Sequence, residues 1–185
     1  MIQKVFKWLT QPLGLVALLI AALAVFSLVV WGIAQAQKPP EQPIQFPHKR
    51  HLAAGVQCLY CHPGAARGAS SGLPTPNKCW GCHQQMNITK TSQLLKPLVA
   101  AIENGTPLEW VPVAQVPDFV QFNHRPHVAY GLNCENCHGD VASLTLPYEN
   151  PQVMNMGWCL NCHQEKAAGN PEMYTKLTDC GTCHY

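Results

Sequence analysis

Five pairs of cysteines are the strongest feature of this 185-residue sequence, and all five have the same form. Two residues separate the cysteines of each pair, a histidine follows the second cysteine, and no cysteine stands outside a pair. The motifs are Cys58-Leu-Tyr-Cys61-His62, Cys79-Trp-Gly-Cys82-His83, Cys134-Glu-Asn-Cys137-His138, Cys159-Leu-Asn-Cys162-His163 and Cys180-Gly-Thr-Cys183-His184. So many cysteines in so short a chain indicate that something other than an aliphatic core organises the fold.

The repeated unit has the form of an attachment site for a c-type haem. Two thiols at this spacing add to the two vinyl groups of the haem, and the adjacent imidazole becomes the proximal ligand of the iron. The sequence therefore predicts five covalently attached haem c groups. A zinc ribbon uses two such pairs for each tetrahedral site, so five pairs would leave one over. A disulfide framework suits an exported chain, but neither alternative gives the five histidines a role.

Four histidines remain after the five motif histidines, and they form two matched frames. The frames are Phe46-Pro-His48-Lys-Arg-His51 and Phe122-Asn-His124-Arg-Pro-His127. Each frame stands seven residues before a haem cysteine. An iron with two axial ligands transfers electrons, whereas an iron with an open face can bind substrate. The four histidines are therefore candidate distal ligands, and they favour electron transfer over catalysis.

The two frames expose an internal duplication. The residues Phe46, His48, His51 and Cys58 recur 76 positions later as Phe122, His124, His127 and Cys134. Cys79 recurs 80 positions later as Cys159. The haem-bearing region is predicted to contain one dihaem module at about 46–105, a second at about 122–163, and a fifth haem within 164–185.

The segments between these motifs carry weaker signals. Pro97 at a first-turn position and Gly105 at the stop position predict a short helix over 97–104. Three prolines in 106–119 predict an extended connector, and the glycine-rich stretch 63–72 reads as a surface loop. Because only about 30 residues serve each haem, the haems themselves are expected to form the core and to lie close to one another.

Four distal histidines leave one of five irons without a second imidazole, and methionine is the usual alternative ligand. Met154 and Met156 are the favoured candidates, because they stand just upstream of Cys159 where the first module has no methionine. Met86 and Met173 remain open alternatives. A methionine ligand predicts one haem of higher potential among bis-histidine haems of low potential.

An uncharged apolar segment covers residues 13–33 and is long enough to span a bilayer. Lys4 and Lys7 precede it, so the positive-inside rule places the N-terminus in the cytoplasm. The sequence predicts a single-pass anchor over 1–37 in the cytoplasmic (inner) membrane, followed by a periplasmic domain over 38–185. A cleaved signal peptide is the alternative, since Ala34-Gln35-Ala36 has the form of a cleavage site.

Composition excludes two other classes of protein. Charged residues make up 12% of the chain and the formal net charge is +2, which gives no basic stripe for a nucleic acid. A hydrophobic content of 47% excludes a disordered chain. The predicted fold class is a haem-cored multihaem cytochrome c of short α-helices and loops, with one N-terminal transmembrane α-helix.

The Phe-x-His-x-x-His frame ahead of Cys-x-x-Cys-His resembles the class III and trihaem cytochromes c. In those proteins the first histidine binds the haem just downstream and the second reaches another haem. The pairs that this resemblance implies are His48 with His62 and His124 with His138. It also implies that His51 and His127 cross to different haems.

More specifically, the chain is similar to the pentahaem subunit of alternative complex III. The shared stretches are Cys79-Trp-Gly-Cys-His-Gln-Gln-Met-Asn, Glu109-Trp-Val, Val116-Pro-Asp-Phe-Val, Phe122-Asn-His and Met156-Gly-Trp-Cys. This resemblance implies that integral membrane partners oxidise quinol and that electrons pass through an iron–sulfur subunit. This chain would then deliver them to a monohaem cytochrome c, a soluble carrier or an oxidase. Its apolar segment lacks the ionisable groups that quinol chemistry needs, so the chain is expected to transfer electrons without being an enzyme itself.

Two other functions remain open. A stand-alone, membrane-anchored quinol dehydrogenase of the tetrahaem type would use Cys82-His83-x-x-Met86 as its quinol-side haem. That motif belongs here to the second haem and not to the one nearest the anchor. A pentahaem nitrite reductase needs an open iron, often marked by lysine in place of the motif histidine, whereas all five motifs here end in histidine.

Overall fold

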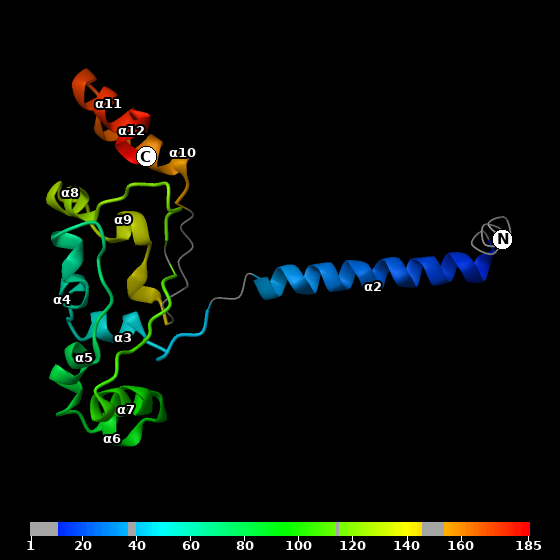
Figure 1. The fold of residues 1–185 in the computed structure, drawn as a ribbon, viewed down its shortest axis with the longest axis horizontal. Coiled ribbons are helices and arrows are strands. Elements are labelled where there is room, and N and C mark those ends of the chain that lie inside the picture. The colour runs from blue at the N-terminus through cyan, green and yellow to red at the C-terminus, as the bar shows by residue number, and fades with distance from the viewer. Residues whose placement is uncertain (1–10, 37–39, 114, 146–153) are drawn as a thin grey trace. The chain divides into compact units, whose positions relative to one another are not determined.

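The computed structural model describes residues 11–36, 40–113, 115–145 and 154–185. The chain divides into two compact units, Met1–Pro40 and Glu41–Tyr185. In the first unit, α2 (Pro12–Ala36) is one uninterrupted helix (Figure 1). Lys4 and Lys7, on which the predicted orientation depends, lie outside the described residues.

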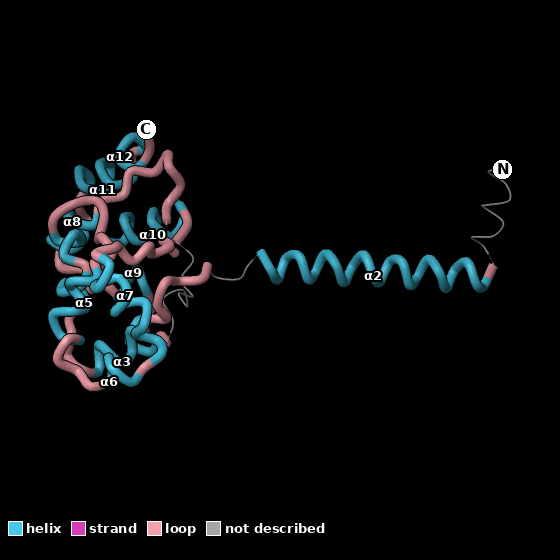
Figure 2. Tube along the Cα trace, turned by 60° about the horizontal axis from the view of Figure 1, so that its bottom comes forward, coloured by secondary structure: helices cyan, strands magenta, loops and turns pink. Residues whose placement is uncertain are grey.

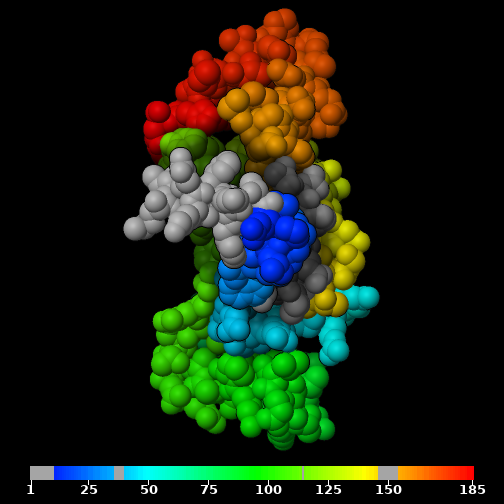
Figure 3. All heavy atoms as spheres, turned by 90° about the vertical axis from the view of Figure 1, so that its right-hand side faces the viewer, coloured from blue at the N-terminus to red at the C-terminus, as the bar shows by residue number. Residues whose placement is uncertain are grey.

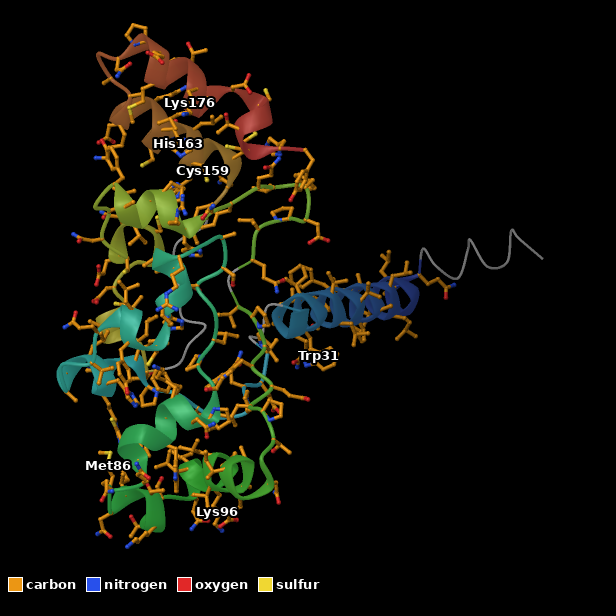
Figure 4. All side chains as sticks on the ribbon, turned by 60° about the vertical axis from the view of Figure 1, so that its left-hand side comes forward. Trp31, Met86, Lys96, Cys159, His163 and Lys176 are labelled. Carbon is orange, nitrogen blue, oxygen red and sulfur yellow. The ribbon has the colours of Figure 1, made fainter. Side chains whose placement is uncertain are left out.

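Helix α2 is apolar on all sides. Its large side chains are exposed, among them Trp31 at 62% (Figure 4). The helix is long and apolar enough to cross a membrane. A signal sequence near an N-terminus has the same properties.

The second unit is built from short helical segments joined by loops, and its described residues contain no strand (Figure 2). The helices are α3 (His48–Ala53), α4 (Cys58–Cys61), η1 (Pro63–Ala66), α5 (Pro76–His83), α6 (Ile88–Thr91), η2 (Gln93–Leu95), α7 (Lys96–Asn104), α8 (His124–Ala129), α9 (Glu135–His138), η3 (Val141–Ser143), α10 (Met156–Lys166), α11 (Pro171–Thr178) and α12 (Cys180–Cys183). The longest of them has 11 residues. Helices this short have little stability of their own in water, so contacts with the rest of the unit must stabilise them.

Local signals determine where several of these helices begin and end. Asn155, Asn170 and Asp179 each accept a backbone N–H at the start of α10, α11 and α12, which is the usual role of an N-cap side chain. Helix α7 ends at Gly105, whose φ of 64° lies in the left-handed region that favours glycine. The short helix predicted over 97–104 is thus present, one residue longer at its start.

Aliphatic packing contributes little to the second unit. Among its described residues the buried hydrophobic side chains are few and mostly small, and Leu98 of α7 is the largest that is fully buried, at 1% exposure. The complete set is Ile44, Ala65, Leu98, Ala101, Leu144 and Ala167. A chain of this length usually buries a contiguous apolar core, whereas the described residues of this unit bury only these six.

The two predicted modules, whose division stays a prediction, pack against each other reciprocally. In the first module α3 packs against η3 of the second, where the Lys49 N–H donates to the Leu144 carbonyl at 3.0 Å. In the second module α8 packs against η1 of the first, where the Arg125 N–H donates to the Gly68 carbonyl at 3.2 Å. The helix that carries the two histidines of each predicted module, α3 or α8, therefore packs against a segment of the other.

The described residues of the connector 106–119 form no helix, as its prolines predict. Its Trp110 indole donates to the Pro74 carbonyl at 3.0 Å, which ties the connector to the first module. Immediately after it, Val120 forms an isolated antiparallel bridge with His184, and the Gln121 N–H donates to the Cys183 carbonyl at 2.8 Å. The connector thus also leads into the contacts that hold the C-terminal motif.

Candidate haem ligand sites

The two His-x-x-His frames form the same local structure. Phe46 meets His48 edge-on, with ring centres 4.9 Å apart at 83°, and stacks on His51 at 4.2 Å. Phe122 meets His124 edge-on at 4.7 Å and 83°, and lies beside His127 at 5.0 Å. In each frame a short helix carries both histidines one turn apart, and the phenylalanine fixes the angle between their rings.

Three of these four histidines face a motif histidine ring to ring. The rings of His124 and His138 have centres 6.3 Å apart, and their planes are nearly parallel, at 8°. The other two opposed pairs are His127 with His163, at 6.1 Å and 22°, and His51 with His83, at 6.2 Å and 48°. The structure therefore brings the second histidine of each frame to the second motif of its own module.

These separations suit a metal ion held between two imidazoles. A metal–imidazole bond is about 2.0–2.1 Å long, and each ring centre lies roughly 1.1 Å behind its nitrogen, so two rings on one metal ion have centres about 6.3 Å apart. The 6.1–6.3 Å separations match that value. Among the described residues no three His, Cys, Asp or Glu side chains gather into a metal site. Two imidazoles at this separation suit a haem iron, which takes two protein ligands.

Backbone carbonyls orient most of the rings by binding Nδ1. His51 bonds the Pro47 carbonyl at 2.9 Å and His127 bonds the Asn123 carbonyl at 2.8 Å, in both cases four residues earlier in the chain. His163 bonds the Leu177 carbonyl at 3.0 Å. A carbonyl only accepts, so these contacts place the proton on Nδ1 and leave the Nε2 lone pair free for a metal.

The Nδ1 of His48 is buried without a hydrogen-bond partner among the described residues. Burial lowers its pKa to about 4, and the neighbouring His62 and His51 imidazoles add to the shift. An imidazole with so low a pKa is neutral at physiological pH and can bind a metal. The pairing of His48 with His62, which the resemblance to class III cytochromes implies, stays a prediction.

All ten cysteines lie in described parts of the chain and none forms a disulfide. In each motif the two cysteines stand three residues apart in or beside a helical turn, on α4, α5, α9, α10 and α12. Residues at this spacing share one face of a helix, and the motif histidine follows directly. This geometry suits the attachment of one haem through two thioether bonds, although the role of each residue stays a prediction.

Neighbouring thiols show which motifs lie side by side. Burial raises the pKa of the Cys79 thiol, and the nearby Cys61 thiol raises it further, so the second motif adjoins the first. Burial also raises the pKa of the Cys134 thiol, with a further rise from the charge of Cys58 and from a hydrogen bond with it. The first motif therefore adjoins the third as well, and it lies between the other two.

The third, fourth and fifth motifs also lie next to one another. Burial, followed by the Cys162 and Cys159 thiols, raises the pKa of Cys137. Burial, followed by the Cys183 thiol, raises the pKa of Cys159. The motifs thus follow one another in space in the order second, first, third, fourth, fifth. The ribbon shows the same order, from α5 beside α6 and α7 at one end to α12 beside α11 at the other (Figure 1).

The fifth motif has a different environment from the other four. The ring stacked on His184 is Phe119, with centres 5.8 Å apart, and the Phe119 carbonyl accepts from Nδ1 at 3.3 Å. Three of the four spare histidines lie against other motif histidines. Met154 and Met156 are 37% and 65% exposed, and Met86 is 46% exposed. The structure does not select one methionine for His184, so the predicted methionine ligand stays a prediction.

Sequence reasoning missed two groups that the structure places at the ligands. One is the Phe119 ring and carbonyl, which the sequence marks only as part of the shared stretch Val116-Pro-Asp-Phe-Val. The other is the backbone of residues 63–72, which reads as a plain surface loop in the sequence but contacts His62 and His124. Backbone carbonyls leave no signal in side-chain identity, so only the glycines of that loop hint at a close approach.

Comparison with known proteins gives two likenesses. Residues 120–185 match the family of cytochrome c7 and related cytochrome c. The chain is also 29% identical, over 164 residues, to the multihaem cytochrome c subunit of menaquinone reductase from Nitratidesulfovibrio vulgaris strain Hildenborough. That alignment covers 78% of this chain and 77% of the relative.

These likenesses support a multihaem c-type cytochrome. The predicted fold class is confirmed: short helices and loops without a strand in the described residues, a cytochrome c7-like C-terminal part, and one apolar helix near the N-terminus. A c7-like cytochrome binds its haems covalently, and its expected role is electron transfer.

Proposed function

We propose that this chain is a membrane-anchored pentahaem cytochrome c that relays electrons as a subunit of a quinol:acceptor oxidoreductase. The observation that carries the proposal is the set of opposed imidazole rings at 6.1–6.3 Å, each joining a spare histidine to a motif histidine. An iron with two imidazole ligands has no open coordination position, so such sites exchange electrons and bind no substrate.

In this proposal some residues attach the haems covalently and others bind the irons as axial ligands. Each haem c would supply a one-electron redox centre. The ten motif cysteines would fix five haems, and the five motif histidines would be the proximal ligands. The four frame histidines would be distal ligands, and Met154 or Met156 is the proposed ligand of the remaining iron.

The proposed anchor is α2, which would cross the cytoplasmic membrane once. With the N-terminus in the cytoplasm, the haem-bearing unit would lie on the periplasmic side. In this proposal the segment is retained and not cleaved after Ala36. The low charge of the chain, 12% of residues, suits a unit whose surface is largely covered by other subunits.

The finer proposal is an assembly like alternative complex III. Its integral membrane subunits would oxidise quinol and its iron–sulfur subunit would pass electrons to this chain. This chain would deliver them to a monohaem cytochrome c or another periplasmic acceptor. The likeness to a menaquinone reductase subunit supports a quinone-reactive complex of several subunits.

A second candidate differs in the direction of flow. The similar protein is a subunit of a menaquinone reductase, which favours electrons entering from a periplasmic donor and leaving to menaquinone through partner subunits. A stand-alone quinol dehydrogenase is the other alternative, with Met86 near its quinol-side haem.

Gentle detergent extraction of the native membrane protein, followed by mass spectrometry of what stays bound on a sizing column, tests the proposal. Co-purification with an iron–sulfur subunit and multi-span membrane subunits is expected. Recovery alone or with only a periplasmic reductase would favour the stand-alone dehydrogenase. Adding quinol or a reduced periplasmic carrier to the oxidised complex, and recording which one reduces the haems faster, decides the direction.

A further inference from the structure

We propose that the loop of residues 63–72 is a shared positioning element for His62 and His124, and that it adjusts the iron potentials of the first and third haem sites together. This inference rests on the proposed haem attachment. It assigns a role to a segment that carries no cysteine, histidine or methionine.

The loop contacts one ligand from each module. The His62 Nδ1–H donates to the Gly72 carbonyl at 2.8 Å, and the His124 Nδ1–H donates to the Ala69 carbonyl at 2.6 Å. His62 precedes the loop directly, whereas His124 lies 55 residues beyond Ala69 in the chain. A single turn of backbone therefore orients an imidazole at the first site and an imidazole at the third.

The loop also holds the backbone of α8. The His124 N–H donates to the Ala69 carbonyl at 3.4 Å, and the Arg125 N–H donates to the Gly68 carbonyl at 3.2 Å. The position of α8, and with it the ring of His124, thus depends on where residues 68 and 69 lie. A movement of the loop therefore changes the hydrogen bond between the His124 ring and the Ala69 carbonyl.

Gly64 closes the loop and leaves no room for a side chain. Its N–H donates to the Ser71 carbonyl at 3.1 Å, and its own carbonyl accepts from the N–H groups of Arg67 and Gly68, both at 2.9 Å. A Cβ on residue 64 would stand 2.7 Å from the Ser71 carbonyl oxygen and would also meet the Ser70 carbonyl. These are backbone atoms, so any side chain at this position forces the loop open.

The other ligands do not share their support in this way. His51 and His127 bond carbonyls four residues earlier in their own frames, at 2.9 and 2.8 Å. His163 bonds Leu177, which is 14 residues away within the C-terminal part. Among the described residues, the loop 63–72 is the segment that supplies Nδ1 acceptors to histidines of both modules.

The hydrogen bond at Nδ1 controls how strongly an imidazole donates to a metal. A short bond to a carbonyl makes the ring more basic, stabilises the oxidised iron and lowers its potential. Lengthening both bonds at once therefore raises two potentials in the same direction. The loop acts through the ligands and touches no iron, so its residues are positioning residues.

Gly64→Ala tests the proposal on the full-length, haem-loaded protein in detergent. A redox titration followed by NMR of the haem methyl groups gives one curve for each haem. We expect the curves of the first and third haems to shift upward together and the other three to stay in place. The Nδ1–H protons of His62 and His124 should also exchange faster with solvent.

Gly68→Ala is the matched control, because a Cβ there meets nothing within 4 Å and its carbonyl contact with α8 is unchanged. It should leave all five curves in place. The inference is wrong if Gly64→Ala shifts the titration curve of only one haem, of no haem, or of all five haems by the same amount.

If Gly64→Ala does not accumulate, Ser70→Ala decides. This variant removes the hydroxyl that accepts the Gly72 N–H at 3.3 Å, between the two carbonyls. A smaller paired shift is expected, and its absence counts against the shared role.

The intact mass of the wild-type chain separates this test from that of the proposed function. A mass without five haem additions contradicts the pentahaem proposal itself. A chain that carries all five haems but shows no paired shift contradicts only the role of the loop.

Discussion

The ring of the second histidine in each frame, His51 or His127, is oriented by contacts within a few residues of it. In both frames the second histidine bonds a carbonyl four residues earlier, and a phenylalanine packs against both rings. This is why Phe-x-His-x-x-His is informative as a sequence pattern: it specifies the ring geometry as well as the ligand type. Which iron each ring reaches depends on the packing of the two modules, and the spacing alone does not reveal it.

His127→Met is expected to raise the midpoint potential of one haem and to leave the number of attached haems at the wild-type value. The thioether donates less to oxidised iron than the imidazole that now faces His163 at 6.1 Å. A redox titration followed by visible spectroscopy measures the change. Tyr130→Phe, on an exposed side chain at the end of α8, is the control. Five unchanged potentials would show that His127 is not a ligand.

The oxidised wild-type protein is expected to show a sulfur-to-iron charge-transfer band, because four spare histidines cannot serve five irons. Either Met154→Leu or Met156→Leu should abolish the band, and Met86→Leu should retain it. Leucine keeps a similar volume, so packing changes little. A wild-type spectrum without the band would mean that the fifth iron is open or has a different ligand.

At the scale of the element, sequence and structure agree where a local signal is strong. Pro97 and Gly105 predict α7, and the prolines of the connector predict a segment without helix. The loop 63–72 is where prediction fell short, since its contacts with α8 join residues about 55 positions apart and involve only backbone carbonyls. Tertiary contacts of this kind follow from the docking of the two modules, which no residue pattern specifies.

Leu98→Ala is expected to destabilise the unit by about 2–5 kcal/mol, the usual cost of a cavity at a buried leucine. Leu98 is the largest fully buried side chain among the described residues. Leu94→Ala, at a position 56% exposed, should stay within about 0.5 kcal/mol of wild type. Guanidinium denaturation followed by circular dichroism measures both variants. Equal stabilities would show that α7 does not contribute to the folded core.

At the scale of the whole molecule, the order of the motifs puts the second and the fifth at the two ends. Met86 and Lys96 mark the region of one end, and Cys159 and His163 lie toward the other (Figure 4). In the space-filling view, residues 75–105 and the C-terminal residues likewise occupy opposite ends of the second unit (Figure 3). If the haems follow their motifs, partners can reach the end haems most directly.

Carbon monoxide is expected to leave the spectrum of the reduced wild-type protein unchanged, because every iron has two protein ligands in the proposed arrangement. His127→Gly should open one iron and bind about one equivalent of the gas. Spectrophotometric titration distinguishes the two cases. Binding by the wild-type protein would reveal an open iron and return the nitrite reductase class to consideration.

The reciprocal packing of α3 on η3 and α8 on η1 has a consequence for the order of events during biogenesis. If the chain is exported as proposed, its first half reaches the periplasm before the segment that supports α3, which lies about 90 residues further on. Thioether formation at the early motifs can therefore take place on an extended, unfolded polypeptide. The two halves then fold together, because each supports a helix of the other. A chain truncated after the first module should therefore be degraded and should not accumulate as a half-length cytochrome.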